Sequence, residues 1–369
     1  MVTSDDRYLG CLFGIAIGDA LGAPVEFRHI SEIHRSYGPS GVSELVQGFY
    51  TDDTQMSLAT ALSLIDTHEA RKELDKYSPT LFAYRRYQEW LKTQRDPRQR
   101  RSPGGTCLSA LAERKMGTIE EHINTSKGCG GVMRTAPVGL AFSPAAAFRY
   151  GAEFAAVTHG HPSGYLSAGF LAELVSFLCD GTGLTEAIMY CRITLAEYES
   201  HEETLAKVDM AMDLARGSMP SVQAIEQLGG GWVGEEALAI SLFCSLRSQS
   251  DWKEGVLAAI NHSGDSDSTG SITGAILGTL LGVKEIPQAW VHKVERSQYI
   301  RETAVQIYEC YRASKIEQFT AEKKMSEFPK AFECPICNSP LKADHPGSYR
   351  CSNCRTVFTI NKQGRFIFD

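Results

Sequence analysis

Apolar residues recur three or four positions apart through most of the chain, which is the spacing of one face of a helix. Few segments alternate between apolar and polar residues as a half-buried strand does. The pattern therefore predicts an all-α, compact helical domain over residues 1–323. The rows that carry it are Leu58, Leu62 and Ile65, then Leu81 and Tyr84, then Leu166, Phe170, Leu174 and Phe177.

The pattern changes near residue 325. Residues 324–331 are rich in charge and are interpreted as a linker. Residues 332–369 place apolar residues between glycines and prolines, which favours short strands joined by turns. A β-rich module of this size buries too little apolar surface to fold unaided, because chains below about 40 residues usually need a cross-link. The expected strand residues are Tyr349, Val357, Thr359, Phe366 and Phe368.

Four cysteines supply such a cross-link. Cys334 and Cys337 form one Cys-x-x-Cys pair, and Cys351 and Cys354 form the second. Two such pairs place four thiolates around one Zn²⁺ ion, so the module resembles a zinc ribbon with one structural zinc. A pair of disulfides or an iron–sulfur site is the alternative. Zinc ribbons stabilise structure or dock a protein or a nucleic acid, so this module does not fix a function.

The composition narrows the class of protein. The 369 residues are 43% hydrophobic, enough for a large core, and the net charge of −7 argues against a general nucleic-acid binder. The N-terminus has acidic residues where a secretory signal needs positive charge. The apolar run at residues 270–283 is too short to span a bilayer, so we expect no membrane segment. Eleven scattered cysteines do not resemble a disulfide framework, which favours a cytoplasmic location.

Two segments carry glycine at every fourth position. On a helix this spacing collects the glycines on one face, where the missing side chains let a helix or a ligand approach closely. Each glycine costs about 1 kcal/mol of helix stability relative to alanine, so the repetition indicates a need for close approach. Two tightly crossed core helices are the preferred interpretation, and direct ligand contact is the alternative. The two glycine ladders are Gly10, Gly14, Gly18 and Gly22, and Gly270, Gly274, Gly278 and Gly282.

Acidic residues stand beside both glycine ladders and before a third helix. Capping explains one carboxylate per helix start, but two of the clusters offer two. If those helix starts converged, the carboxylates would repel one another unless a cation lay between them. Oxygen ligands suit Mg²⁺ or Mn²⁺. The spacing leaves a two-metal site and plain capping both open. The clusters are Asp19 with Glu26, Thr51 with Asp52 and Asp53, and Asp265 with Asp267 and Ser268.

Six motifs in the first 283 residues resemble those of the ADP-ribosylglycohydrolases. Each motif is weak alone, but their order and spacing together are specific. The resemblance implies an all-α domain whose cleft holds two Mg²⁺ or Mn²⁺ ions. In chain order the motifs are GCLFGIAIGDALGAPVEF, YTDDTQM, SPGGTC, GCGGVMRTAPVGL, THGHPSGYLSAG and GDSDSTGSITGAILG.

The resemblance also implies roles for individual residues. Glu26 matches a glutamate on a mobile segment that gates the site or assists catalysis, and the candidate catalytic residues are Glu26, Asp53 and Asp265. Thr269 is assigned to structure. The implied metal ligands are Thr51, Asp52, Asp53, Asp265, Asp267 and Ser268, the last a serine where relatives often have threonine.

Glycine-rich segments would bind the ADP-ribose, because exposed backbone N–H groups suit a pyrophosphate. Cys129 stands where many relatives have Asn, and Arg134 is expected to pair with a buried carboxylate or, less favourably, with a phosphate. The arginine-rich run at residues 95–101 is a solvated loop or steers an anionic substrate. The expected substrate-binding residues are Gly104, Gly105, Thr106, Gly130, Gly131, Val132, Met133 and His159.

These roles lead to a hypothesis for the reaction. Two Mg²⁺ or Mn²⁺ ions would support hydrolysis of the N- or O-glycosidic bond that links ADP-ribose to a modified protein side chain, arginine first among the candidates. The expected partner is therefore an ADP-ribosylated protein. The alternatives are a metal-dependent phosphohydrolase acting on nucleotide-like substrates and a non-catalytic ADP-ribose-binding protein.

Overall fold

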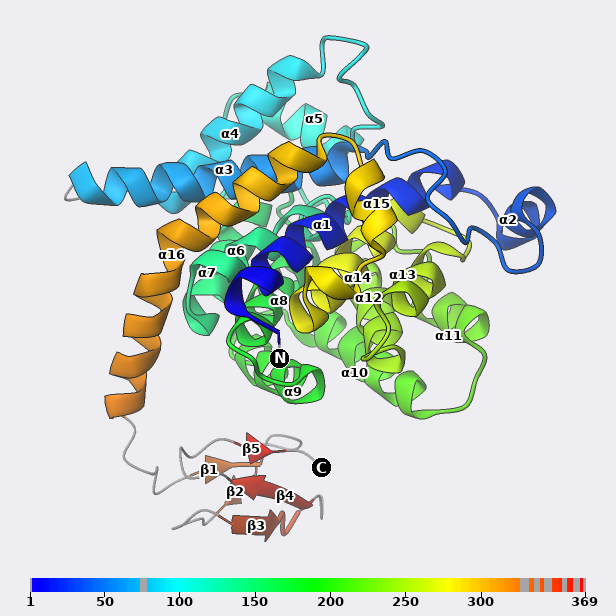
Figure 1. The fold of residues 1–369 in the computed structure, drawn as a ribbon. Helices are drawn as coiled ribbons and strands as arrows, with labels where there is room; N and C mark the ends of the chain where they lie inside the picture. Colours follow the sequence, from blue (N-terminus) through cyan, green and yellow to red (C-terminus); the bar gives the residue numbers. More distant parts are fainter. Residues whose placement is uncertain are drawn as a thin grey trace.

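A computed structural model of the chain describes residues 2–73, 78–325, 332–334, 339–341, 347–353, 357–360 and 366–367. The expectation of a mostly helical domain is confirmed, since the described residues up to 325 form helices and the loops that join them (Figure 1). One isolated β-bridge joins Gly128 to Val233 within this domain.

The helices in chain order are α1 (Ser4–Gly22), α2 (Ile30–Tyr37), α3 (Asp52–Glu73), α4 (Pro79–Thr93), α5 (Gly105–Ala112), α6 (Ala136–Ala141), α7 (Pro144–Ala156), α8 (Pro162–Cys179), α9 (Leu184–Leu195), α10 (Glu202–Arg216), α11 (Ser221–Leu228), α12 (Gly234–Arg247), α13 (Trp252–Ile260), α14 (Ser266–Leu281), α15 (Gln288–Lys293) and α16 (Ser297–Met325). Three single 3₁₀ turns accompany them: η1 (Ala23–Val25), η2 (Val132–Arg134) and η3 (Val283–Glu285).

Helices α1 and α14 lie side by side at the centre of the domain, and both glycine ladders face the contact (Figure 1). A methyl group on Gly14 would lie 2.0 Å from the carbonyl oxygen of Gly274, and one on Gly18 would lie 2.1 Å from that of Gly270. Only glycine allows backbones to approach this closely. The structure therefore confirms helix–helix packing as the reason for the ladders.

Helix α8 is a second core element, buried on almost every side between α6, α7, α9 and α12. Its predicted apolar row is confirmed, because Leu166, Phe170 and Leu174 are fully buried. A helix that is apolar all round belongs in the interior rather than at a surface. Leu81 of α4 differs from its expected place, since 37% of it is exposed.

Helix α1 with the turn that follows it, Ser4–Val25, has the length and apolar composition to cross a membrane. However, 83% of this apolar stretch is buried inside the fold, against α14 and its neighbours. Its apolar character therefore follows from packing in the core.

The described C-terminal residues form two small antiparallel sheets. Strand β1 (Phe332–Glu333) pairs with β2 (Pro340–Leu341), and β4 (Val357–Ile360) pairs with both β3 (Gly347–Arg350) and β5 (Phe366–Ile367). The expected strand residue Phe368 lies outside the described residues. Helix α16 runs to Met325, two residues beyond the predicted domain boundary, and residues 326–331 of the predicted linker are also outside the description.

The predicted zinc ligands are described only in part. Cys334 and Cys351 are both buried. The backbone N–H of Cys334 donates to the carbonyl oxygen of Ser339 at 2.8 Å, next to the paired strands β1 and β2. Cys337 and Cys354 lie outside the described residues, so the zinc site stays a prediction.

Candidate active site

A cavity of about 190 Å³ opens where the segment after η1 meets the starts of α3, α5 and α14. The loop before η2 and the loop before α12 complete its wall. The cavity brings together most of the residues that the sequence nominated from distant motifs. The lining residues are Glu26, Phe27, Asp52, Asp53, Ser102, Gly104, Gly105, Thr106, Cys107, Gly128, Cys129, Gly130, Met133, His159, Trp232, Asp265, Asp267 and Ser268.

Asp19, a residue that the sequence analysis placed in an acidic cluster but not in the site, holds the start of α3. Its carboxylate accepts hydrogen bonds from the backbone N–H groups of Thr51 at 2.9 Å and Thr54 at 3.0 Å, and from the Thr54 hydroxyl. These bonds satisfy N–H groups that a helix start leaves without partners. Burial raises the pKa of Asp19 to about 6, although these hydrogen bonds oppose the shift. Asp19 thereby fixes α3 to the end of α1.

The start of α14 places its own acidic residues. Asp265 is the N-cap and accepts from the backbone N–H of Ser268 at 3.3 Å, while Asp267 accepts from the same N–H at 2.9 Å. Thr269 points away from the cavity: its hydroxyl donates to the carbonyl oxygens of Ala259 and Asp265 and contacts His262 at 2.9 Å. The assignment of Thr269 to structure is confirmed.

Five carboxyl groups line the cavity, and no lysine or arginine is among the described lining residues. Burial, followed by the charges of Asp265 and Asp19, raises the pKa of Glu26 to about 8. Burial also holds the pKa values of Asp52, Asp53 and Asp267 well above their usual range. Burying ionised carboxylates without a nearby cation costs free energy, so a bound cation would stabilise the ionised form of these groups.

The glycine-rich segments form the wall opposite the acids. The Gly104 N–H donates to Asp52 at 3.3 Å, and Gly104 and Gly105 face open space at the start of α5. His159 is buried behind Gly130, with its Nδ1 at 2.8 Å from the Thr158 hydroxyl. Burial and then the Arg134 charge lower the pKa of His159 to about 3. His159 is therefore a neutral, positioned side chain.

Three nominated residues lie outside the lining. Thr51 caps α3, accepting from the Asp53 N–H at 3.3 Å, and its own N–H is taken by Asp19. Gly131 packs against Ala155 and Gly164, and Val132 is fully buried in η2. Since all three adjoin lining residues, they support the wall from behind.

Arg134 was expected to be buried beside a carboxylate. It is buried, but its partners are neutral groups. It donates to the Phe154 carbonyl at 3.0 Å and to the Thr158 hydroxyl at 2.6 Å, and its guanidinium lies 4.3 Å from the ring centre of Tyr87. Within the described residues it has no carboxylate partner, so the expected buried ion pair was wrong. Hydrogen bonds and the aromatic face stabilise the charge instead.

Several cavity residues were missed. Phe27 and Trp232 stand at the mouth, 61% and 49% exposed, with their rings stacked. Cys129 was expected only as a departure from the Asn of many relatives, and its Sγ lies 3.1 Å from Asp265 Oδ2. Ser102, Cys107 and Gly128 also line the cavity. Large exposed aromatic residues beside a polar cavity are a recognisable signal only after folding, since the sequence does not bring Phe27 and Trp232 together.

The donor set fits hard divalent cations. Asp53 Oδ1 is buried and has no hydrogen-bond partner. The carboxylate and hydroxyl oxygens of Asp52, Asp267 and Ser268 line the same cavity. Such oxygen ligands suit Mg²⁺ or Mn²⁺. Cys129 adds one softer donor to an otherwise hard set.

The chain matches two protein families. The profile of the ADP-ribosylglycohydrolases matches residues 2–316, and that of a domain of unknown function matches residues 331–369. The ADP-ribosyl-[dinitrogen reductase] glycohydrolase of Rhodospirillum rubrum is 27% identical over 300 residues, covering 79% of this chain and 90% of the relative. The ADP-ribosylarginine hydrolase Tri1 of Pseudomonas putida is 26% identical over 332 residues, covering 86% and 81%.

A solved structure shares the fold. An ADP-ribosylglycohydrolase-related protein complex aligns with a TM-score of 0.59 and 24% identity, over 83% of this chain and 98% of that one. The family profile covers the helical domain as far as residue 316, within α16, and includes every residue that lines the acidic cavity. The chain therefore belongs to the ADP-ribosylglycohydrolase family, and it is a hydrolase of the glycosidase type.

Proposed function

We propose that this protein releases ADP-ribose from a modified protein side chain, with arginine as the first candidate linkage, in a reaction that depends on two Mg²⁺ or Mn²⁺ ions. The observation that carries the proposal is the cavity in which five carboxyl groups meet glycine-rich backbone amides without a lysine or arginine. The arginine linkage is supported by the relative named ADP-ribosylarginine hydrolase.

The cations would be held by the oxygens of Asp52, Asp53, Asp265, Asp267 and Ser268, with Thr51 as a further ligand through its hydroxyl. The unpartnered Oδ1 of Asp53 supports this. Among the His, Cys, Asp and Glu side chains that the structure describes, three ligand atoms come within 4.8 Å of one another only at His68, Glu69 and Cys310, outside the cavity. The number of ions, two, is proposed from the resemblance to the family. Bound cations neutralise the acids and act as Lewis acids toward hydroxyl groups and water.

The substrate's pyrophosphate would lie against the start of α5. The backbone N–H groups of Gly105 and Thr106 belong to the first turn of that helix, where anions are favoured. Gly104 and Gly105 leave the approach open because no atom lies within 4 Å of where their side chains would begin. Gly130, Met133 and the neutral His159 would form the wall beside the ribose.

Proton transfer is assigned to the carboxyl groups at the acidic end. Glu26 is the first candidate, since it lines the cavity and burial raises the pKa of its carboxyl group, which favours a form that can hold a proton. Asp53 and Asp265 are the other candidates, and their carboxylates would also stabilise a cation-like transition state at the anomeric carbon.

The test is a linkage panel. Full-length protein is incubated with arginine-linked and serine-linked ADP-ribosylated proteins and with Mg²⁺ or Mn²⁺, and free ADP-ribose is measured. We expect release from at least the arginine linkage and none from Asp265→Asn. Phosphate release without ADP-ribose would instead identify a phosphohydrolase, and binding without any product would identify a non-catalytic protein.

Two further parts of the proposal concern the C-terminal module, residues 332–369, and the location of the protein in the cell. Cys334, Cys337, Cys351 and Cys354 would bind one structural Zn²⁺, and the module would stabilise the chain or dock a protein or nucleic acid. A cytoplasmic location is proposed from the scattered cysteines. Removing residues 332–369 and comparing ADP-ribose release from several target proteins separates docking, which changes target preference, from stabilisation, which does not.

A further inference from the structure

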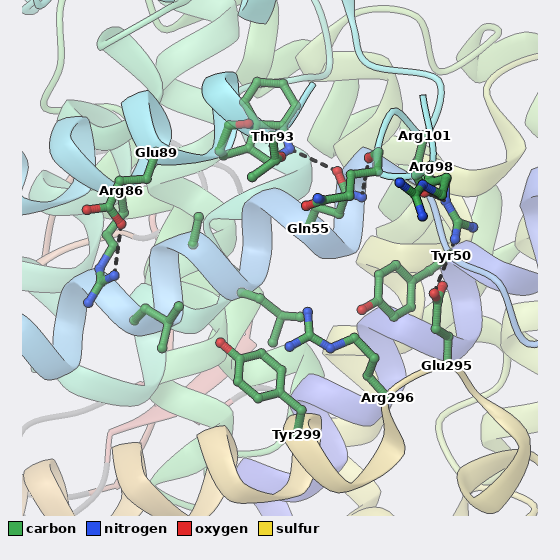
Figure 2. A pocket seen from close by; sticks show the side chains of 15 residues that line it. Tyr50, Gln55, Arg86, Glu89, Thr93, Arg98, Arg101, Glu295, Arg296 and Tyr299 are labelled. Atoms are coloured by element: carbon green, nitrogen blue, oxygen red, sulfur yellow. Dashed lines mark hydrogen bonds and ion pairs between the residues drawn. The ribbon is translucent and has the colours of Figure 1, made fainter. Parts of the chain in front are cut away.

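A second cavity, of about 380 Å³, lies between α3, α4 and the start of α16 (Figure 2). It is about twice as large as the acidic cavity and falls within the size range of small-molecule sites, about 300–1,000 Å³. The two cavities share no lining residue. Part of its lining comes from the arginine-rich run at residues 95–101, for which steering of an anionic substrate was one of two expectations.

The lining has the opposite charge to the acidic cavity. It contains four arginines and two glutamates, in a protein with a net charge of −7. Arg101 pairs with Glu295 at 3.1 Å. Arg86 pairs with Asp66 at 2.6 Å and with Glu89 at 2.9 Å. These pairs neutralise Arg86 and Arg101, so Arg98 and Arg296 are the guanidinium groups left for a ligand.

Arg296 carries the strongest indication of a ligand. Within the described residues it has no ion-pair partner, and its guanidinium stacks over the Tyr299 ring at 4.1 Å. Its side chain reaches into the cavity from the start of α16 (Figure 2). Its backbone φ is +54°, a left-handed conformation that L residues other than Gly, Asn and Asp rarely adopt. Strained conformations of this kind concentrate at binding sites.

Arg98 is the second available donor. Its contact with Asp96 is long, at 3.5 Å, and 92% of its side chain is exposed, so solvent screens that pair. Arg98 and Arg296 approach the cavity from different segments, one before α5 and the other at the start of α16. Two guanidinium groups on separate walls can grip one multivalent anion.

From these observations we infer that this cavity is a binding site for a small phosphate-bearing anion, distinct from the acidic cleft. Arginine forks match phosphate oxygens in pairs, which a carboxylate-lined cleft cannot do without cations. Thr93 and the Tyr299 ring line the same cavity and would add polar and aromatic contacts.

The site is joined to the cleft by the segment that separates them. The Asp52 N–H donates to the Arg101 carbonyl at 2.9 Å, and Gln55 Nε2 donates to the Gln99 carbonyl at 2.9 Å. Ser102 and Gly104 then line the cleft a few residues on. A ligand bound by Arg98 therefore touches the same segment that carries the amides of the cleft.

Isothermal titration of the full-length protein with inorganic pyrophosphate tests the inference. Mg²⁺ and Mn²⁺ are omitted from the buffer, because the cation-free carboxylates then repel pyrophosphate from the cleft. We expect one pyrophosphate per chain, and binding at least about tenfold weaker in Arg296→Gln, the loss typical of one charge-assisted hydrogen bond. A parallel titration with ADP distinguishes two kinds of ligand. If ADP binds more tightly than pyrophosphate, the site recognises a nucleotide. If the two bind equally, the site recognises the phosphate groups alone.

Two further variants make the result decisive. Arg296→Gly accommodates the positive φ, so it should lose pyrophosphate binding without a lower melting temperature. Arg95→Gln is the matched control, because Arg95 lies on the same segment but lines a different cavity. Absence of pyrophosphate binding in the parent protein, or equal weakening in Arg95→Gln, overturns the assignment. Neither result depends on the proposed glycosidase reaction.

Discussion

The rings of Phe27 and Trp232 stack across the mouth of the acidic cavity, with centroids 5.1 Å apart and planes 13° from parallel. Phe27 follows the candidate catalytic residue Glu26 and is held by a hydrogen bond from its N–H to the Gly264 carbonyl at 2.8 Å. The carbonyl of Trp232 accepts from the Cys129 N–H at 3.1 Å on the other side. The stack therefore links the segment that carries Glu26 to the far wall.

Trp232→Ala should reduce kcat/KM for ADP-ribose release by about fivefold, because an aromatic pair is worth about 1 kcal/mol and the Glu26 segment loses its contact with the far wall. Steady-state kinetics on the arginine-linked substrate measure this. Tyr37→Ala is the control, since Tyr37 is a partly exposed aromatic residue on α2 outside the cavity lining. An unchanged kcat/KM in Trp232→Ala would show that the stacked rings do not contribute to the reaction.

Asp53→Asn should weaken Mn²⁺ binding at least about tenfold, since a carboxylate whose buried oxygen lacks a partner is replaced by a neutral amide. Titration calorimetry with Mn²⁺ measures the affinity and the number of ions. Asp96→Asn, on an exposed loop, should bind like the parent protein. Equal affinity in Asp53→Asn would show that the cations are held elsewhere.

Glu173 gives the helical core a pH dependence of its own. It is buried, accepts from the Thr194 hydroxyl at 2.8 Å, and leaves Oε2 without a partner. Burial raises its pKa to about 8. Between the ordinary value of about 4.5 and 8, the unfolded chain loses this proton and the folded chain keeps it, so stability falls as the pH rises through that window.

The measurement is denaturant unfolding at pH 6 and pH 9. Glu173→Gln should be more stable than the parent protein at pH 9, by on the order of 3 kcal/mol, and the gap should close toward pH 5. Glu186→Gln, on the partly exposed surface of α9, is the matched control. A pH-independent gap between parent and Glu173→Gln would contradict the assignment.

Gly14→Ala should destabilise the protein by at least about 3 kcal/mol, because the new methyl group would meet the Gly274 carbonyl oxygen at 2.0 Å and neither backbone can yield. Gly183→Ala should be nearly neutral, since that glycine has open space around it and an ordinary φ of −66°. Thermal unfolding of the two variants compares them directly. Similar melting temperatures would mean that α1 and α14 do not pack at this distance.

Purified protein should contain one zinc per chain by elemental analysis, and Cys334→Ser should lose it, because three remaining thiolates bind zinc far more weakly than four. Cys244→Ser is the control, since Cys244 lies on α12 in the helical domain. Retention of zinc in Cys334→Ser would place the metal at another site.

The sequence predicted features correctly where residues of one kind recur at a fixed spacing within one segment. Glycine at every fourth position predicted the α1–α14 contact because the spacing is a property of the helix itself. Asp265 and Asp267 were nominated because two carboxylates exceed what one helix cap needs. In each case the information lies within one segment of chain, so no knowledge of the fold was required.

The features that were missed depend on contacts between distant segments. Nothing in the local sequence of Trp232 indicates that Phe27 will lie against it. Arg134 was expected beside a carboxylate, but its neighbours come from α7 and α4 and are neutral. The basic cavity needs residues from α3, α4 and α16 together. Such sites become visible only when the chain path is known.

The packing of α1 on α14 also determines when the active cleft can exist. The two helices come from residues 4–22 and 266–281, so α1 leaves the ribosome long before its partner is made. Until α14 has been synthesised, α1 has no partner helix to pack against, and its apolar side chains are exposed to water. Asp19 and Asp265 come together only when the ladders close. The cleft is therefore a late product of synthesis, and a chain that stops before residue 265 carries three of the five cavity carboxyl groups and lacks the wall that α14 supplies.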